Sequence, residues 1–459
     1  MNSVFILTYG CTLNKSDSEC LLGQLRKEGF ELADSIESAD LVIVNSCVVK
    51  QLAETKFFRM LRKLKKLNKK VVIAGCIPQA RKELIQTKLK DYSIIGIEML
   101  DQVCFVVEET LNGNVVQLIG TKPVDRTQSK NVLGSMSVGS SHDLFNSNDD
   151  RLNLPKVRKN KIIEIIPISK GCVGNCSYCK TKAARGELFS YDSKAIIRRA
   201  KDAITAGCKE IWITSQDCGA YGVDIGTNIV ELLSELIRLE GDFKIRVGMS
   251  NPNFIKEFLP GLKDIFQSEK MFKFIHIPVQ AGSDRILNLM NRKYSRLDFL
   301  QIVKELRSAV PTMTIATDII CGFPTETESE FQESLDLIKI TKPEIINISR
   351  FWSRPGTPAA ELKQLAGTIT NTRSRKIANL FKKISKDYLV KLVGSTQEII
   401  VDGIGKSTES VVSFIGHNES YTQVIVNQKK LQKNKLQLGD LVKVKITSSS
   451  SHYLIGEII

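Results

Sequence analysis

Short apolar runs alternate with amphipathic stretches over the first 110 residues of the chain. The runs "SVFIL", "LVIVN", "VVIAG" and "SIIGI" have the length and composition of buried strands, and each is followed by a stretch with helical spacing. Strands that alternate with helices favour a parallel sheet covered by helices. We therefore predict a small N-terminal α/β domain with a parallel sheet over residues 1–112.

The pattern changes at two later points. Residues 113–155 lose the apolar periodicity and become rich in Ser, Asn, Gly and Asp, which is typical of a linker. Six further strand and helix units follow within residues 156–392 and favour a partial (β/α)6 barrel of the TIM type, with a trailing basic helix. Residues 393–459 alternate with period two between Gly and Asn turns, which predicts a small β-barrel. The fold class is therefore α/β and multidomain.

Composition restricts the class of protein. The chain has 459 residues, 42% of them hydrophobic and 25% charged, and no apolar run approaches the length of a membrane span. No basic leader precedes the first apolar stretch, so we expect a cytoplasmic protein with no membrane partner. We also expect the protein to be a monomer. Eleven cysteines in this context are more consistent with reduced thiols and metal ligands than with disulfides.

The net charge of +15 is concentrated in two segments. Residues 59–70 carry seven Lys and Arg with no acid, and residues 372–391 carry seven Lys and Arg against Asp387 alone. Each segment alone is equally consistent with a solvated helix face. Two such cationic faces favour a polyanionic partner, because clustered Lys and Arg release counterions when they meet phosphates.

Three cysteines lie just after the first three predicted strands. Cys11, Cys47 and Cys76 occur in "TYGCTLN", "NSCVV" and "AGCIPQ". The carboxyl ends of parallel strands meet at one edge of a sheet, where ligands bind. We therefore expect these cysteines to converge although they are far apart in sequence.

A second set of cysteines is local. The loop "SKGCVGNCSYCK" after the first barrel strand contains Cys172, Cys176 and Cys179. Three thiolates from one short loop suit a [4Fe-4S] cluster with one open iron, which can bind the amino and carboxylate groups of S-adenosylmethionine. The alternatives are a zinc site, which would need a fourth Cys or His, and core cysteines, which would not need this spacing.

The sequence resembles the radical S-adenosylmethionine methylthiotransferase family over nearly its whole length. The resemblance rests on "GCVGNCSYC" with "RGELFS", on "TYGCTLNKSDSE", "VNSCVV" and "AGCIPQA", and on "SQDCGAYG", "RVGMSNP", "HIPVQAGSDRILNLMNRKY", "DIICGFPTET" and "RFWSRPGTPAA". The C-terminal β-barrel resembles the RNA-binding module called TRAM.

This resemblance implies two [4Fe-4S] clusters. The catalytic cluster, held by Cys172, Cys176 and Cys179, would reduce S-adenosylmethionine to a 5'-deoxyadenosyl radical. The second, held by Cys11, Cys47 and Cys76, would take part in sulfur delivery. An external electron donor and a sulfur source are then required. Asn14, Asp17 and Glu19 are candidates to surround the second cluster, although Asp17 could equally start a helix.

The resemblance also implies a set of residues that bind S-adenosylmethionine: Ser215, Gln216, Asp217, Arg246, Pro278, Gln280 and Arg292. For Gln216 and Asp217, helix capping is an equally good interpretation. For Arg246 and Arg292, an equally good interpretation is an arginine that forms a salt bridge within the barrel. Relatives usually have serine at the position of Ala281, so contacts there can differ.

Within the family, the motifs look most like the archaeal and eukaryotic branch. That branch adds a methylthio group to C2 of N6-threonylcarbamoyladenosine at position 37, in the anticodon stem-loop of tRNA. The alternative substrates are isopentenyladenosine tRNA and an aspartate of a ribosomal protein. The alternative from another class is a non-catalytic Fe-S protein that binds tRNA. The terminal barrel carries a net charge of only +1 over residues 392–459, so we expect the basic helix at 372–391 to contribute more to tRNA binding.

Overall fold

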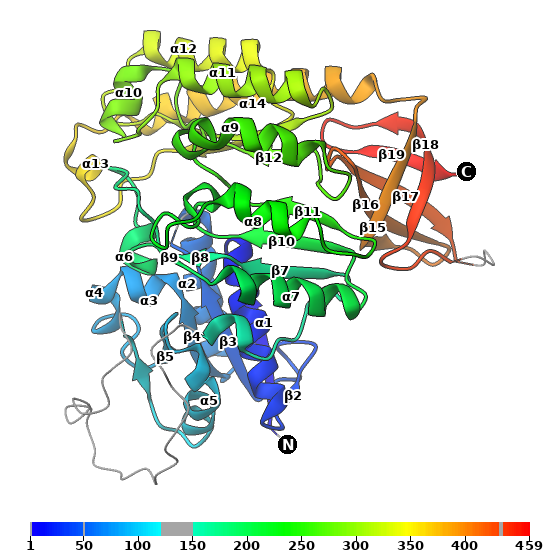
Figure 1. The fold of residues 1–459 in the computed structure, drawn as a ribbon. Coiled ribbons are helices and arrows are strands. Elements are labelled where there is room, and N and C mark those ends of the chain that lie inside the picture. The colour runs from blue at the N-terminus through cyan, green and yellow to red at the C-terminus, as the bar shows by residue number, and fades with distance from the viewer. Residues whose placement is uncertain (1, 49–50, 121–149, 431–434) are drawn as a thin grey trace. The chain divides into compact units, whose positions relative to one another are not determined.

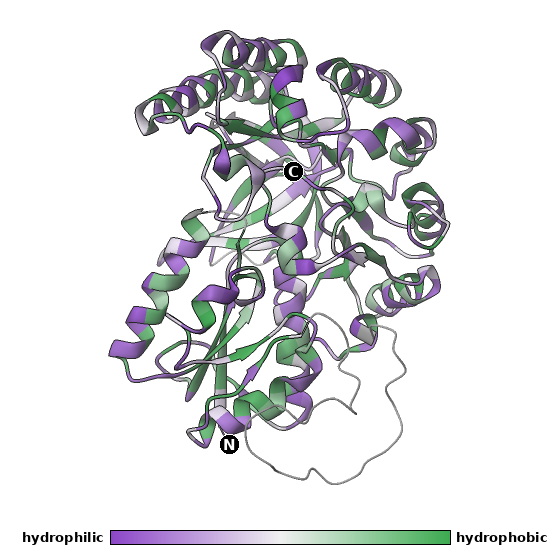
Figure 2. Ribbon diagram, turned by 90° about the vertical axis from the view of Figure 1, so that its left-hand side faces the viewer, coloured by the Kyte–Doolittle hydropathy of each residue, from purple (hydrophilic) through white to green (hydrophobic). Residues whose placement is uncertain are grey.

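The computed structural model describes residues 2–48, 51–120, 150–430 and 435–459. The chain forms two compact units, which are described separately (Figure 1). Unit 1 comprises Met1–Val157 together with Lys180–Glu187, and unit 2 comprises Arg158–Cys179 and Leu188–Ile459. Figure 2 shows apolar strands within the sheets and helices that combine apolar and polar stretches, as expected for elements buried on one side.

Unit 1 is built on a six-stranded sheet with the order β2-β1-β3-β4-β5-β6. All its strand pairs are parallel. The strands are β1 (Ser3–Thr8), β2 (Glu31–Leu32), β3 (Leu41–Ser46), β4 (Lys70–Gly75), β5 (Ser93–Ile95) and β6 (Gln117–Leu118). The helices are α1 (Thr12–Lys27), α2 (Gln51–Lys66), α3 (Cys76–Ala80), α4 (Lys82–Ile85), α5 (Val103–Leu111) and α6 (Thr181–Arg185). The predicted parallel-sheet domain is confirmed, with two short strands, β2 and β6, in addition to those expected.

Both faces of this sheet are covered because its strands are apolar on both sides. Along β3, Val42 and Val44 pack in one core with residues of α2 and α3. Leu41 and Ile43 pack in the other core with residues of α1 and α5. A strand buried on two faces has a continuous apolar run, as "LVIVN" does.

The predicted linker at 113–155 contributes at both ends to unit 1. Strand β6 pairs with β5, beyond the predicted domain boundary at residue 112. At the other end, the backbone N–H of Val157 donates to the carbonyl of Glu19 over 2.9 Å. A Cβ added at Gly23 of α1 would approach the Pro155 carbonyl oxygen to 2.1 Å, so this close packing requires glycine. Residues 121–149 of the predicted linker lie outside the described residues.

The central part of unit 2 contains the six parallel strands expected of a partial barrel. They form two sheets, β11-β10-β7 and β12-β13-β14. Their bounds are β7 (Ile163–Pro167), β10 (Glu210–Thr214), β11 (Lys244–Val247), β12 (Phe274–His276), β13 (Thr314–Cys321) and β14 (Ile345–Arg350). A short antiparallel pair, β8 (Ser169–Lys170) and β9 (Phe189–Ser190), accompanies them.

Helices alternate with these strands. They are α7 (Ser193–Thr205), α8 (Ile229–Leu236), α9 (Pro252–Gln267), α10 (Asp284–Leu289), α11 (Arg296–Ala309), α12 (Glu328–Thr341), α13 (Pro358–Glu361) and α14 (Gly367–Val390). Capping boxes start α11 at Ser295 with Asp298 and α12 at Thr327 with Glu330. The sequence signals for these two helix starts are therefore local.

The C-terminal part of unit 2 is a closed five-stranded barrel with the order β15-β16-β17-β19-β18. Its strands are β15 (Thr396–Ser407), β16 (Val411–Asn418), β17 (Gln423–Lys429), β18 (Leu441–Ser449) and β19 (Leu454–Ile458). Alternate residues such as Val424 and Val426 fill the barrel core. The predicted small β-barrel is confirmed.

No helix among the described residues is long and apolar enough to cross a membrane.

Candidate functional site: two cysteine trios

The loop of Cys172, Cys176 and Cys179 follows β7 and β8 at the carboxyl end of the first barrel strand. Its backbone is fixed by neighbouring segments. The Ser177 N–H donates to the Met290 carbonyl over 3.1 Å, and the Ser177 hydroxyl donates to the Leu289 carbonyl over 2.7 Å. The Asn291 side-chain amide donates to the Asn175 carbonyl over 2.8 Å. The end of α10 therefore holds the loop in place.

Two of the three sulfurs of this loop, those of Cys172 and Cys176, lie beside Gly174. A Cβ added at Gly174 would lie 3.5 Å from the Cys172 sulfur and 3.7 Å from the Cys176 sulfur. The Gly174 N–H donates to the Cys172 sulfur over 3.3 Å. Burial raises the pKa of Cys172 to about 12, so this thiol needs a bound cation to ionise near neutral pH. Soft thiolates around a small glycine cradle fit an iron-sulfur cluster.

A chain of polar contacts connects the loop to the end of β10. The Arg292 Nη1 donates to the Cys176 sulfur over 3.0 Å, and its Nη2 donates to the Asn251 Oδ1. Asn251 in turn donates from its backbone N–H to the Asp217 Oδ1 over 3.0 Å. Burial raises the pKa of Cys176, and the positive charge of Arg292 opposes that shift.

These four residues also line one cavity. Its other lining residues are Val173, Gly174, Asn175, Asn253, Phe254, Asn291 and Lys293. Asp217 additionally caps a short helical turn, because its Oδ1 accepts from the Gly219 N–H over 3.2 Å. Capping and a position in the cavity therefore occur together at Asp217.

The other residues predicted to bind the cofactor have different surroundings. Ser215 accepts from the backbone N–H of Asp217 over 2.9 Å. The Gln216 Oε1 is buried without a hydrogen-bond partner among the described residues. The Pro278 carbonyl accepts from the Tyr294 hydroxyl over 2.9 Å. Gln280 follows β12 with a φ of 70°, in the left-handed region. None of the four is among the residues lining the cavity beside Cys176.

Arg246 lies in an aromatic cage instead of this cavity. Its guanidinium carbon is 5.1 Å from the Trp212 ring centre, 5.0 Å from that of Phe274 and 4.9 Å from that of Tyr421. Tyr421 belongs to the turn between β16 and β17 of the terminal barrel. The structure thus brings Arg292, but not Arg246, together with the cysteine loop, and Arg246 joins the two parts of unit 2.

The second trio converges within unit 1, as expected for residues at the carboxyl ends of parallel strands. The side chain of Asn14 lies at the centre: its Oδ1 is 3.4 Å from the Cys11 sulfur and 3.9 Å from the Cys76 sulfur. A Cβ added at Gly10 would lie 3.0 Å from the Cys47 sulfur and 3.3 Å from the Asn14 Cγ. Cys11 is exposed, whereas Cys47 and Cys76 are buried. The thiols of Cys11 and Cys76 therefore share the buried Asn14 side chain, and the Cys47 thiol lies beside Gly10.

Buried ion pairs surround this trio. Asp17 accepts from Arg151 Nη1 over 3.1 Å and from Arg185 Nη2 over 2.7 Å. The side chains of all three are at most 4% exposed. Glu19 pairs separately with Lys156 over 3.2 Å. Asp17 lies inside α1 and does not start it.

Two residues beside the cysteines were not predicted from the sequence. Asn251 stands in "SNPNF" and Arg185 in "RGELFS", and both stretches overlap motifs that carry the family resemblance. Their contacts are with residues distant in sequence: Asn251 contacts Asp217 and Arg292, and Arg185 contacts Asn14 and Asp17. The motifs marked these stretches, but spacing along the chain gives no signal for which side chain points to the thiols.

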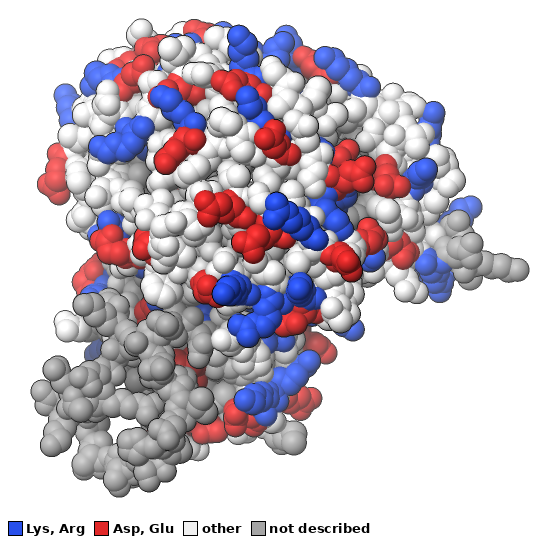
Figure 3. Space-filling model, in the orientation of Figure 1, with Lys and Arg blue, Asp and Glu red and all other residues white. Residues whose placement is uncertain are grey.

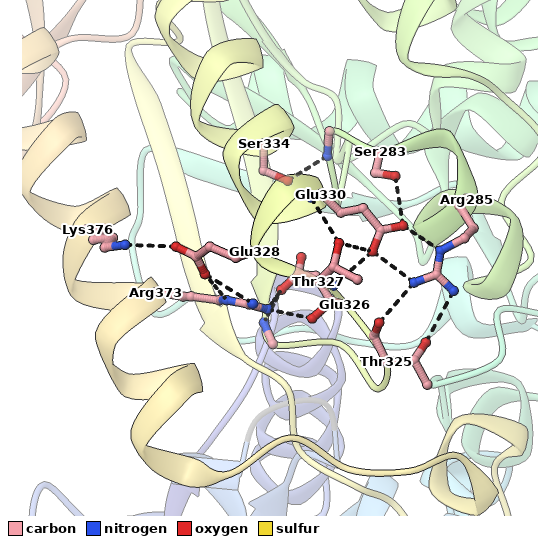
Figure 4. Close-up of polar contacts among 12 residues, drawn as sticks. Ser283, Arg285, Thr325, Glu326, Thr327, Glu328, Glu330, Ser334, Arg373 and Lys376 are labelled. Atoms are coloured by element: carbon pink, nitrogen blue, oxygen red, sulfur yellow. Dashed lines mark hydrogen bonds and ion pairs between the residues drawn. The ribbon is translucent and has the colours of Figure 1, made fainter.

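The basic helix α14 has fewer available cations than its sequence indicates (Figure 4). Arg373 is buried and pairs with Glu326 over 2.7 Å and with Glu328 over 3.2 Å. Lys376 pairs with Glu328 over 2.9 Å. Both carboxylates lie at the start of α12, so these two cations attach α14 to the barrel. On the face drawn in Figure 3, Lys and Arg are interspersed with Asp and Glu.

Comparison with family models identifies three parts of the chain. Residues 3–96 match "Uncharacterized protein family UPF0004", residues 166–338 match the Radical SAM superfamily, and residues 390–459 match the TRAM domain. A solved structure with a similar fold is the radical S-adenosylmethionine methyltransferase TsrM from Kitasatospora setae, with a TM-score of 0.53 and 14% identity. The alignment covers 78% of this chain and 74% of that one. The protein is therefore a radical SAM protein, a class defined by a [4Fe-4S] cluster and S-adenosylmethionine.

Relatives define the family within that class. The chain is 41% identical to the threonylcarbamoyladenosine tRNA methylthiotransferase of Drosophila melanogaster, covering 99% of this chain and 77% of the relative. It is 40% identical to the human protein of that name over 100% of this chain and 74% of the relative. It is 37% identical, over 100% of both chains, to the Pyrococcus horikoshii protein named "Probable threonylcarbamoyladenosine tRNA methylthiotransferase". The chain belongs to the threonylcarbamoyladenosine tRNA methylthiotransferase family, as its motifs indicated.

Proposed function

We propose that this protein adds a methylthio group to C2 of N6-threonylcarbamoyladenosine at position 37, in the anticodon stem-loop of tRNA. The observation that carries the proposal is identity of 37% to 41% with relatives of that name over 99% or more of this chain. Conversion of an adenine C–H into a C–S bond requires the removal of an unactivated hydrogen, and a radical SAM protein supplies that chemistry.

Cys172, Cys176 and Cys179 would hold the [4Fe-4S] cluster that this reaction uses. When bound, the cluster supplies the electron that cleaves S-adenosylmethionine, and an external donor must replace that electron. Arg292 donates to the Cys176 sulfur and orients Asn251, which is held by Asp217. Asn251 and Asp217 offer polar groups in the cavity for the amino and carboxylate groups of the cofactor. Ser215, Gln216, Pro278 and Gln280 remain candidates for its other parts.

Cys11, Cys47 and Cys76 would hold a second [4Fe-4S] cluster that receives the sulfur atom. Three converging thiols, of which that of Cys11 is exposed, support this assignment because an open iron must be reached by an external sulfur source. Arg151 and Arg185 place two positive charges against the single carboxylate of Asp17 nearby. That surplus of positive charge suits an anionic group at this site.

The tRNA would be bound by the TRAM barrel together with exposed cations of α14. Lys382, Lys383 and Lys386 are exposed and have no ion pair among the described residues. They are available for phosphate oxygens, in contrast to Arg373 and Lys376.

Nucleoside mass spectrometry tests the function directly. The purified protein is reconstituted anaerobically and incubated with reductant, S-adenosylmethionine, sulfide and either of two tRNAs. One tRNA carries threonylcarbamoyladenosine and the other carries isopentenyladenosine. We expect a methylthio product from the first tRNA. A product from the second tRNA alone would overturn the substrate assignment, and no 5'-deoxyadenosine from either would overturn the enzyme assignment.

A further inference from the structure

Arg185 is a buried cation with unused hydrogen-bonding capacity. It ends the short helix α6, and only 3% of the residue is exposed. Its Nη2 donates to the Asn14 Oδ1 over 3.1 Å and to the Asp17 Oδ2 over 2.7 Å. Its Nε and Nη1 are buried with no hydrogen-bond partner among the described residues. A buried donor without a partner is destabilising, and more so when it is charged, so these nitrogens indicate a missing acceptor.

The position of Arg185 identifies where that acceptor binds. Asn14 presents its Oδ1 both to Arg185 and to the sulfurs of Cys11 and Cys76. The orientation of Asn14 is fixed, because its Nδ2 donates to the Ser46 carbonyl over 2.8 Å. The guanidinium therefore shares this oxygen with two thiols of the second trio, and it is also within hydrogen-bonding reach of the Cys76 thiol itself.

The local charge indicates the sign of the missing ligand. Two guanidinium groups, of Arg151 and Arg185, oppose one carboxylate, that of Asp17. Arg151 uses its second amino group on the Ile97 carbonyl, whereas Arg185 lies beside the thiols. A buried surplus of positive charge is stable only when an anion compensates it.

We propose that Arg185 binds the anionic sulfur that the second trio receives, either a hydrosulfide or the terminal sulfur of a polysulfide. The inference rests on the proposed function, because it presumes a cluster held by Cys11, Cys47 and Cys76. A guanidinium suits this ligand since its N–H groups form a fixed fork around an anion. The exposed Cys11 marks the side from which a soluble sulfur anion can enter. Arg185 thereby selects a charged sulfur donor over a neutral thiol.

The test measures sulfur binding without turnover. The parent is the full chain with Cys172→Ala, Cys176→Ala and Cys179→Ala, so that only the second trio can hold a cluster. After anaerobic reconstitution, iron is quantified, and the reduced cluster is titrated with sodium hydrosulfide and separately with sodium polysulfide. Electron paramagnetic resonance reports binding. The parent is compared with Arg185→Gln, Arg185→Lys and the matched control Arg151→Gln, which removes the other cation that pairs with Asp17.

We expect Arg185→Gln to keep its iron and to bind the sulfur anion about 10- to 100-fold more weakly, as expected for the loss of charge-assisted hydrogen bonds. Arg185→Lys should recover part of this affinity, and Arg151→Gln should stay close to the parent. Of hydrosulfide and polysulfide, the one whose affinity falls more between the parent and Arg185→Gln is the form of sulfur that the site binds naturally.

Four results would overturn the inference. Unchanged sulfur affinity in Arg185→Gln would show that the guanidinium does not bind the anion. An equal loss of sulfur affinity in Arg151→Gln would show that Arg185 acts only through the overall charge of the site and does not bind the anion. Loss of iron in both Arg185 variants would make Arg185 a cluster-holding residue. A parent without iron at the trio would overturn the proposed second cluster as well, so the two failures are distinguishable.

Discussion

Arg292 shows how one side chain connects the cysteine loop to the rest of the barrel. Its three nitrogens contact the Cys176 sulfur, the Asn251 Oδ1 and the Tyr294 hydroxyl. The family motif placed Arg292 at the site, but its contact with the thiol depends on the fold. Spacing could not predict it, because the two residues are 116 positions apart.

Removal of this guanidinium should weaken cluster binding by the loop. In a background of Cys11→Ala, Cys47→Ala and Cys76→Ala, we expect Arg292→Met to bind the loop cluster about 10- to 100-fold more weakly, since a charge-assisted hydrogen bond to the thiolate is lost. Iron content after chelator competition measures this change. Lys293→Met is the matched control, because Lys293 lines the same cavity. Equal iron retention in the two variants would contradict the role given to Arg292.

Glu210 gives a second prediction, on stability. Burial and the nearby Asp402 carboxylate raise the pKa of Glu210 from 4.5 to about 7. The folded protein therefore holds this proton more tightly than the unfolded chain does. The free energy of unfolding should therefore fall as the pH rises from 4.5 towards about 7. Above about 7 it should fall no further on account of this group.

Glu210→Gln should remove this dependence while it keeps the hydrogen bond from the Trp212 Nε1, which is 2.6 Å long. We expect the variant to be more stable than the wild type at pH 8, by on the order of 3 kcal/mol, with a smaller difference at pH 5. Urea unfolding at the two pH values measures both free energies. A variant less stable than the wild type at pH 8 would show that the ionised carboxylate stabilises the barrel.

At the scale of elements, α14 shows what a charge pattern can and cannot predict. The helix and its cationic character were clear from the sequence. The pattern could not show that two of these cations, Arg373 and Lys376, form ion pairs. Their partners are Glu326 and Glu328 at the start of α12. Cations that serve as ion pairs and cations that are free for RNA look alike in a sequence, because their partners are supplied by another element.

The free cations of α14 should contribute to tRNA binding. We expect Lys382→Glu with Lys383→Glu to weaken tRNA binding and to lower the dependence of affinity on salt concentration, because about two phosphate contacts are lost. Filter binding at several salt concentrations measures both quantities. The control is Lys304→Glu with Lys339→Glu, which makes the same change in net charge but places it on α11 and α12. An equal loss in that control would indicate a general charge effect instead of a contact surface on α14.

At the scale of the whole molecule, the order of strands explains how distant cysteines form a site. The sheet order β2-β1-β3-β4-β5-β6 puts the carboxyl ends of β1, β3 and β4 side by side. The convergence of Cys11, Cys47 and Cys76 was predictable from the sequence, because each follows a strand of a predicted parallel sheet and the carboxyl ends of such strands meet at one edge. The charge balance around them was not, because Arg151 and Arg185 reach Asp17 from segments more than 130 residues away.

The same contrast applies to the terminal barrel. Period-two alternation predicted the barrel. The Arg246 cage was not predicted, since it combines Trp212 of β10, Phe274 of β12 and Tyr421 of the terminal barrel. Local periodicity determines elements, whereas contacts between elements decide which charged side chains remain available for a ligand.

The measurement that tests the account most directly separates the tasks of the two cysteine trios. The wild type and the variant with Cys11→Ala, Cys47→Ala and Cys76→Ala are each reconstituted and incubated with reductant, S-adenosylmethionine, sulfide and tRNA bearing threonylcarbamoyladenosine. 5'-Deoxyadenosine and the methylthio nucleoside are quantified in the same samples. We predict both products from the wild type and 5'-deoxyadenosine alone from the variant. A methylthio product from the variant would contradict the assignment of sulfur delivery to the second trio.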